Sequence, residues 1–94
     1  MTIEEVKIEL EKIVFDLSSS GFDNIDSGTV EKLEKIAASA GELGMMEGKK
    51  LIGNLSRAME AIKEGKSLAE SGALRLIALD FYVKNLPDGN TEDL

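Results

Sequence analysis

The side chains that most often carry out chemistry in proteins are largely missing from this chain. It contains no histidine and no cysteine among its 94 residues. Zinc and haem sites of the usual kind, Ser/His/Asp triads, thiolate nucleophiles and disulfides are therefore excluded. Carboxylates, lysines, serines and the single tyrosine, Tyr82, remain, and they form no recognisable catalytic motif. We expect a protein that is not an enzyme and that has no cofactor and no metal site.

Two kinds of site could still be built without cysteine, and the spacing of the residues supports neither. Paired metal sites in helical bundles use Glu-x-x-His motifs, which need histidine. Phosphate-binding loops need GxxxxGK[ST], or GxGxxG after a strand, and the nine glycines follow neither pattern. The glutamates are most simply interpreted as solvated surface residues.

The charge balance limits the kinds of partner that the protein could bind. The formal net charge is −7, from 18 acidic and 11 basic residues, and the basic residues alternate with glutamates along the chain. This pattern is unsuited to binding a phosphate backbone or an anionic lipid surface. No apolar run approaches the roughly 20 residues of a membrane span. We therefore expect no nucleic-acid partner, no membrane partner and a cytoplasmic location.

Apolar spacing predicts where the first helix lies. Apolar residues recur at intervals of three and four over residues 3–17, which is the pattern of one helix face. Thr2 and Glu5 form a candidate capping box at its start. A turn-rich segment follows, and we expect its two large apolar residues, Phe22 and Ile25, to lie under the bundle.

Two further helices follow at the same periodicity. The second is expected to begin at Asp26 or Ser27 and to stop near Gly44. The third falls within residues 46–65, with Gly65 placed to end it. Their apolar stripes consist of Val30, Leu33, Ile36, Ala37, Ala40 and Leu43, and of Leu51, Ile52, Leu55, Met59 and Ile62.

The fourth segment has the widest apolar face of all. A capping box of Ser67 and Glu70 is expected to open it, and Pro87 should stop it. Because so many of its positions are apolar, we expect this helix to be the most enclosed of the four. Its apolar residues are Leu68, Leu74, Leu76, Ile77, Leu79, Phe81, Val83 and Leu86.

These segments together predict the fold class. No segment alternates as a strand does, and the last two connections are short. Short connections place consecutive helices side by side in opposite directions. We therefore expect one all-α domain over residues 1–87, an antiparallel up-down-up-down four-helix bundle, followed by a flexible acidic tail over residues 88–94.

The stretch LEKIAASAGELGM, residues 33–45, is helical in period and unusually rich in small residues. Glu34, Ala38, Gly41 and Met45 follow at i, i+4, i+7 and i+11, which places them on one face, offset from the core stripe. Such a shallow face lets another backbone approach closely. The alternative is that the small residues only allow two helices of the same bundle to pack together. Met45 and Met46 could likewise form a docking patch, or one could lie in the core and the other could cap the end of the bundle.

The same stretch resembles the signature of histidine-containing phosphotransfer (HPt) domains. Ile36 takes the place of the family's Leu, Ser39 and Ala40 match its Ser-Ala pair, and Leu43 with Gly44 closes the motif. Downstream, Leu51, Leu55, Met59 and Gly65 are similar to the family's third helix. The resemblance covers about residues 28–68. The phospho-accepting histidine falls on Glu34, the family's basic residue on Ala37 and its first small residue on Ala38.

The resemblance implies an HPt-like fold and a protein partner, either a response-regulator receiver domain or a histidine kinase. It also implies a chain that does not transfer phosphate, because Glu34 has no nucleophilic nitrogen and Ala37 carries no charge. Such a pseudo-phosphotransfer domain would regulate or scaffold two-component signalling. A fixed negative charge at Glu34 could imitate part of a phosphohistidine. The expected docking face consists of Glu34, Ala37, Ala38, Gly41, Met45 and Lys49.

An alternative of another class remains open. The chain could be a structural helical module for interaction or oligomerisation, with no receiver partner. The two hypotheses differ in what a change on the docking face would affect, which is receiver affinity in the first and oligomeric state in the second. We expect a monomer or a weak homo-oligomer.

Overall fold

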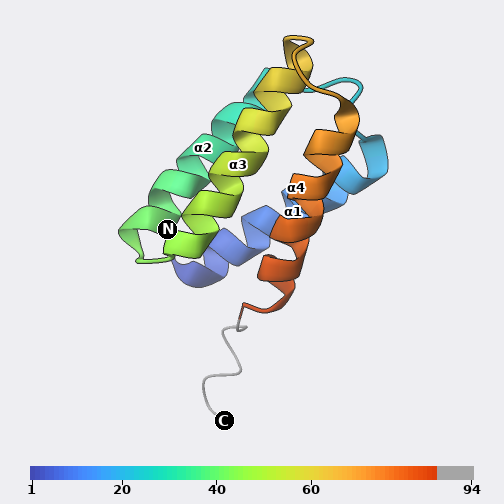
Figure 1. Ribbon diagram of the computed structural model, residues 1–94. Helices are drawn as coiled ribbons and strands as arrows, with labels where there is room; N and C mark the ends of the chain where they lie inside the picture. Colours follow the sequence, from blue (N-terminus) through green and yellow to red (C-terminus); the bar gives the residue numbers. More distant parts are fainter. Residues whose placement is uncertain (87–94) are drawn as a thin grey trace.

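The computed structural model describes residues 1–86, which form four α-helices and no strand. The prediction of an all-α fold is confirmed. Pro87 and the expected tail over residues 88–94 lie outside the described residues. None of the helices up to residue 86 is long and apolar enough to cross a membrane. The helices are α1 (Ile3–Ser20), α2 (Ser27–Glu42), α3 (Met46–Lys63) and α4 (Ala69–Lys84) (Figure 1).

The four helices pack around one apolar core. α2 lies along α3, α3 contacts α4, and α1 contacts both α4 and α2, so that each helix touches two others (Figure 1). Most residues of the stripes predicted in the first three helices point into this core, because residues three and four apart share one helix face. Ile3 and Leu43, at the ends of two of these stripes, are exposed instead. The most deeply buried side chains are Val6, Leu10, Leu33, Ile36, Ile52, Leu55, Met59, Leu79 and Val83.

Local capping fixes where the first two helices begin. The Thr2 hydroxyl accepts a hydrogen bond from the Glu5 backbone at 3.1 Å, and the Thr2 backbone donates to the Glu5 carboxylate at 2.8 Å. Asp26 caps α2 by accepting from the Gly28 backbone at 2.9 Å. Both expected starts are confirmed. The side chain satisfies backbone donors that have no partner inside the helix.

The predicted start of α4 is wrong. No side chain caps this helix, and Leu68, not Ser67, precedes its first residue. The Ser67 backbone still donates to the Ala61 carbonyl at 3.3 Å, so Ser67 belongs to the closing turn of α3. That turn contains Gly65, whose φ of +77° is the left-handed conformation that glycine adopts most easily.

The prediction that α4 is the most enclosed helix is also wrong. Leu76, Leu79 and Val83 reach the core, but Leu74, Ile77 and Phe81 on the other side are exposed. A helix at the edge of a four-helix bundle can bury one face only, whatever the hydrophobicity of the rest. The apolar residues of α4 therefore form an exposed surface on one side of the helix as well as a core contact on the other.

α4 approaches the rest of the bundle closely at Gly72. A Cβ atom there would lie 2.8 Å from the Phe22 ring and 2.9 Å from Ile62 Cδ1. Phe22 is buried beneath α4 and Ile25 is half-buried, as expected from the sequence. By contrast, a Cβ atom on Gly53 in α3 would meet only the exposed guanidinium of Arg57, at 3.2 Å.

A polar contact ties the two ends of the described chain together. Lys7 in α1 is buried, and its ammonium donates to the Leu86 carbonyl at 2.8 Å. Burial of a lysine is tolerated when its charge is satisfied by hydrogen bonds. The start of α1 is thereby fixed against the end of α4.

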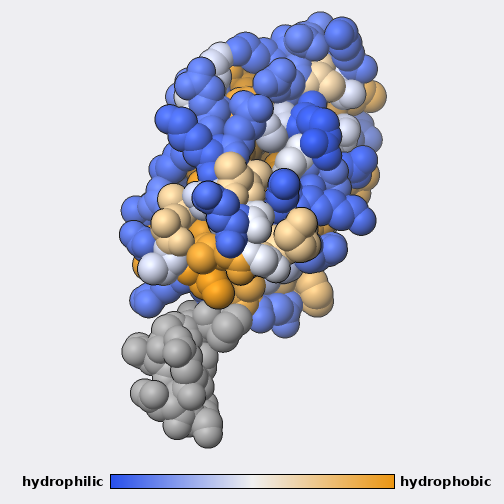
Figure 2. Space-filling model, turned by 90° about the vertical axis from the view of Figure 1, so that its left-hand side faces the viewer, coloured by the Kyte–Doolittle hydropathy of each residue, from blue (hydrophilic) through white to orange (hydrophobic). Residues whose placement is uncertain are grey.

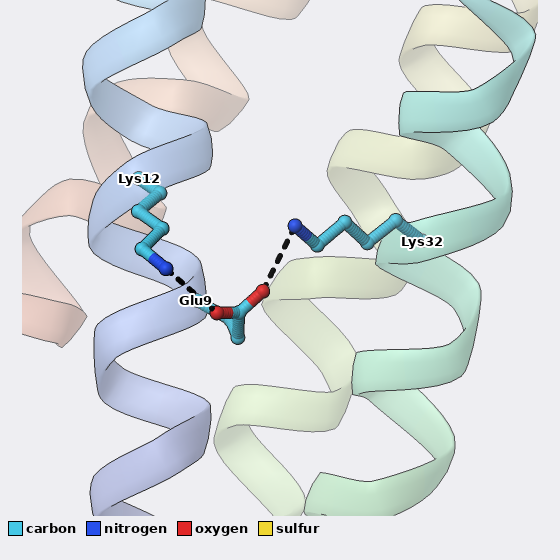
Figure 3. Close-up of polar contacts among 3 residues, drawn as sticks. All are labelled: Glu9, Lys12 and Lys32. Carbon is cyan, nitrogen blue, oxygen red and sulfur yellow. Dashed lines mark hydrogen bonds and ion pairs between the residues drawn. The ribbon is translucent and has the colours of Figure 1, made fainter.

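An ion-pair cluster connects α1 to α2. The Glu9 carboxylate contacts Lys12 of its own helix at 3.2 Å and Lys32 of α2 at 2.8 Å (Figure 3). The hydrogen bond from Lys32, followed by that from Lys12, lowers the pKa of Glu9. Because all three side chains are partly exposed, their contribution to stability is modest.

The contrast between Gly72 and Gly53 can be tested. We expect Gly72→Ala to lower the free energy of unfolding by about 1–2 kcal/mol, because overpacking against Phe22 outweighs the gain in helix propensity. Gly53→Ala should raise it by up to about 1 kcal/mol, because the flexible Arg57 can move. Urea unfolding of both variants measures the difference, and equal stabilisation by both would contradict the close approach of α4.

The Glu9 cluster predicts a pH dependence. A carboxylate whose pKa is lowered by folding stabilises the protein above its unfolded pKa, and that stability is lost as the pH falls through the lowered value. Glu9→Gln should therefore lower the melting temperature at neutral pH, and the difference should disappear in acid and shrink in high salt. Glu11→Gln, on the exposed side of α1, is the matched control. An unchanged difference at low pH would contradict the assignment.

Candidate functional site

The small-residue stretch lies on the outer face of α2. Leu33, Ile36 and Ala40 are buried, which turns the opposite side of this helix outward. Glu34 and Ala38 are exposed there. Beside them, Ala37 and Gly41 are half-buried at the edge of the core.

α3 provides the second wall of this surface. A Cβ atom on Gly41 would lie 3.0 Å from Lys49 Cδ, so the Lys49 side chain crosses the end of α2. At the other end, the Lys63 ammonium donates to the Ser27 hydroxyl. α2 and α3 therefore run in opposite directions. Gly53, four residues after Lys49, lies on the same side of α3 and is half-buried.

We call this area the α2–α3 surface, and five of the six residues expected from the sequence line it or border it. Its centre carries only the small residues Ala38, Gly41 and Gly53, and the flexible side chains of Lys49 and Arg57 lie against the two glycines. Gly53 is not among those six, although its position in the sequence predicts close packing or docking there. The signal was a glycine inside a helix, a position that costs about 1 kcal/mol relative to alanine. The surface consists of Glu34, Ala37, Ala38 and Gly41 on α2, and Lys49 and Gly53 on α3.

Met45 is a correction to the expected docking face. It is only 9% exposed and packs in the core. The spacing from Glu34 to Met45 assumed one continuous helix, but α2 ends at Glu42 and Gly44 turns the chain with φ +80°. The Met45 backbone then donates to the Ala40 carbonyl at 2.8 Å, which directs the residue inward. The alternative interpretation, that one of the two methionines belongs to the core, is confirmed.

Charge is unevenly distributed along the two helices. Glu34 borders a depression between them that is also lined by three more glutamates, with Lys63 as its one cation. Toward the other end, Lys49 is exposed, and Arg57 is exposed near the middle of α3. Sequence reasoning missed the acidic half, although the spacing of its glutamates by three or four residues places them on shared faces. The residues lining the depression are Ser27, Val30, Glu31, Glu34, Glu60, Lys63 and Glu64.

The geometry limits the chemistry of Glu34. Within residues 1–86, Glu34 has no hydrogen bond and no ion pair. No group of three or more acidic side chains in that range is arranged to hold a metal ion. Ala37 leaves no cation one turn away. The carboxylate is therefore available to a partner, and the one cation in the same depression, Lys63, donates to the Ser27 hydroxyl.

Figure 2 shows the side of the molecule on which α2 lies in Figure 1. Hydrophilic side chains cover most of this view. Pale and orange residues gather in its lower half, at the height where α2 ends and α3 begins. This side therefore combines a charged surround with a limited area of small or apolar residues.

Comparison with known proteins gave no match: no protein-family model, no curated protein and no solved structure matches the chain. The function is therefore inferred from the chain itself, namely from the spacing of residues 34–44 and from the surface on which those residues lie.

Proposed function

We propose that this chain is an HPt-like docking domain that binds a response-regulator receiver domain or a histidine-kinase module without transferring phosphate. By occupying that partner it would regulate or scaffold two-component signalling. The observation that carries the proposal is the position of Glu34, which is exposed at the middle of α2 beside the small-residue strip of Ala38 and Gly41. An HPt domain places its phospho-accepting histidine in the same setting.

The proposal includes the up-down-up-down order of the helices. The opposed directions of α2 and α3 support it, as does the packing of each helix on its neighbours in the chain. The three-residue segment between α2 and α3 would then close one end of the docking surface. Two residues before it, Gly41 leaves room for the Lys49 stem.

The shallow centre of the α2–α3 surface favours a helix as the docking element. Packed helix axes lie about 8–10 Å apart, and the shorter separations need small side chains at the contact. Ala38, Gly41 and Gly53 meet this requirement on both walls. The apolar stem of Lys49 can cover part of an incoming helix while its ammonium stays in water and pairs with an acidic group of the partner.

Phosphoryl transfer needs groups that this surface lacks. In the family, an imidazole nitrogen attacks the aspartyl phosphate of a receiver and a lysine helps to hold the phosphoryl group. Here the corresponding side chains are a carboxylate and a methyl group. Glu34 carries one fixed negative charge, less than a phosphoryl group, so the domain would present a constant surface rather than a switchable one.

Receiver binding is the first test. Titrating labelled protein with receiver domains encoded by the same organism should identify at least one that binds. Ala38→Arg should weaken this binding tenfold or more, because a long charged side chain fills the shallow centre. Ala73→Arg, the same change at an exposed alanine of α4, should leave it unchanged. No binding receiver, or an equal loss in both variants, would contradict the proposal.

Restoring the chemistry is the second test. In Glu34→His/Ala37→Lys, the introduced imidazole should attack the phosphorus of a receiver's aspartyl phosphate. The new P–N bond replaces the P–O bond, and the receiver's carboxylate is released. Radiolabel should pass from receiver to domain. Glu31→His/Ala37→Lys, with the imidazole one turn away on the same exposed side, should gain none. Failure of the first variant to gain label from a receiver that binds it would contradict the HPt-like geometry.

A further inference from the structure

The outer face of α4 is apolar where a bundle surface is normally polar. Leu74, Ile77, Ala78 and Phe81 are spaced i, i+3, i+4 and i+7, so they form one continuous stripe along the helix. The three large members are 62%, 66% and 72% exposed. We call these four residues the α4 stripe. A stripe of this spacing is the pattern by which helices pack against each other.

No residue of the described chain covers the α4 stripe. α4 contacts the bundle through its opposite side, where Leu76, Leu79 and Val83 are buried. Two charged residues mark the ends of the stripe, Glu70 and Lys84. Glu70 has no ion pair within residues 1–86. Lys84 contacts Asp80 of the same helix at 2.8 Å, an exposed pair that contributes little.

We infer that the α4 stripe is a homodimer interface, in which α4 packs antiparallel against α4 of a second copy around a twofold axis near Ile77 and Ala78. In this register Leu74 faces Phe81 of the second copy, and Ile77 faces Ala78 of the second copy beside the twofold axis. Each contact occurs twice, as a symmetric interface requires. The stripe is self-complementary in size, because leucine meets phenylalanine at both ends of the contact.

The charges select the antiparallel arrangement. In it, Glu70 of each copy lies beside Lys84 of the other, giving two opposite-charge pairs. A parallel arrangement would instead place Glu70 beside Glu70 and Lys84 beside Lys84, which like-charge repulsion disfavours. The charge pattern therefore fits a second copy of this chain as the occupant of the stripe.

The exposed area sets the strength of the association. The three large side chains expose about two thirds of their surface, roughly 350 Å² of apolar area for each copy. A standard interface buries about 800 Å² for each partner. The net charge of −7 on each copy also opposes association. The dimer is therefore weak, with a dissociation constant on the order of 100 µM.

α1 offers a matched control in the same molecule. Phe15 is 71% exposed, almost the same as Phe81. Its surroundings differ, because Glu11 and Lys12 interrupt the apolar positions on that face of α1. Phe15 therefore has the exposure of an interface residue without a continuous stripe around it.

Sedimentation equilibrium between about 10 µM and 1 mM tests the inference. The average mass should rise from 10.1 kDa toward twice that value. Phe81→Asp should weaken association at least tenfold, and Phe15→Asp should not. Glu70→Lys should also weaken it, and Glu70→Lys/Lys84→Glu should restore it by reversing both pairs. Circular dichroism verifies that each variant is folded.

Cross-linking tests the register independently. Because the chain has no cysteine, Ile77→Cys introduces a single thiol that lies close to its equivalent beside the twofold axis. Mild oxidation should give a disulfide-linked dimer much faster than with Phe15→Cys.

Several outcomes would overturn the inference. They are a monomer at 1 mM, equal loss of association in both Phe→Asp variants, or equal cross-linking in both cysteine variants. If the protein is monomeric and another chain covers the α4 stripe, the inference fails as well. Ala38→Arg on the α2–α3 surface should leave the dimer unchanged, so this result is independent of receiver binding.

Discussion

Burial of Leu33, Ile36 and Ala40 is the constraint on which the candidate site depends. These three residues fix the rotation of α2 about its own axis. A rotation by one residue, about 100°, would turn Glu34 toward the core. Because the buried stripe is aliphatic and continuous with the core side chains of α3, α2 has one favourable orientation. The exposure of Glu34 and Ala38 follows from the packing on the opposite side of the helix.

Much of this arrangement could be predicted from the sequence, because local rules decide it. Thr2 and Asp26 cap their helices through residues two or three positions away, and Gly44 and Gly65 end helices in a conformation that few other residues adopt. The outer face of α2 follows from helical spacing alone. The HPt-like interpretation of that face remains a proposal, carried by the match of residues 34–44 and by the exposure of Glu34.

The remaining features depend on tertiary contacts. Met45 lies beyond the end of α2, where helical spacing no longer applies, and its place in the core is set by the turn at Gly44. The late start of α4 depends on how far the closing turn of α3 extends. The exposed face of α4 could not be foreseen from its hydrophobicity, since the same residues would suit a helix enclosed on all sides. Helical spacing places Lys7 off the apolar stripe of α1 and so predicts a surface residue, yet Lys7 is buried against the Leu86 carbonyl.

That contact between Lys7 and Leu86 has a consequence for the order of folding. It joins residues 79 positions apart, whereas α2 and α3 meet across a short turn. Closing so long a loop has a high entropic cost, and contacts between distant residues form late when local ones can form first. α2 and α3 would therefore assemble first as a helical hairpin, and the contact between α1 and α4 would form last. In native-state fluctuations the contact between α1 and α4 would open first. The pair of helices that carries Glu34 therefore belongs to the part of the domain that unfolds least often.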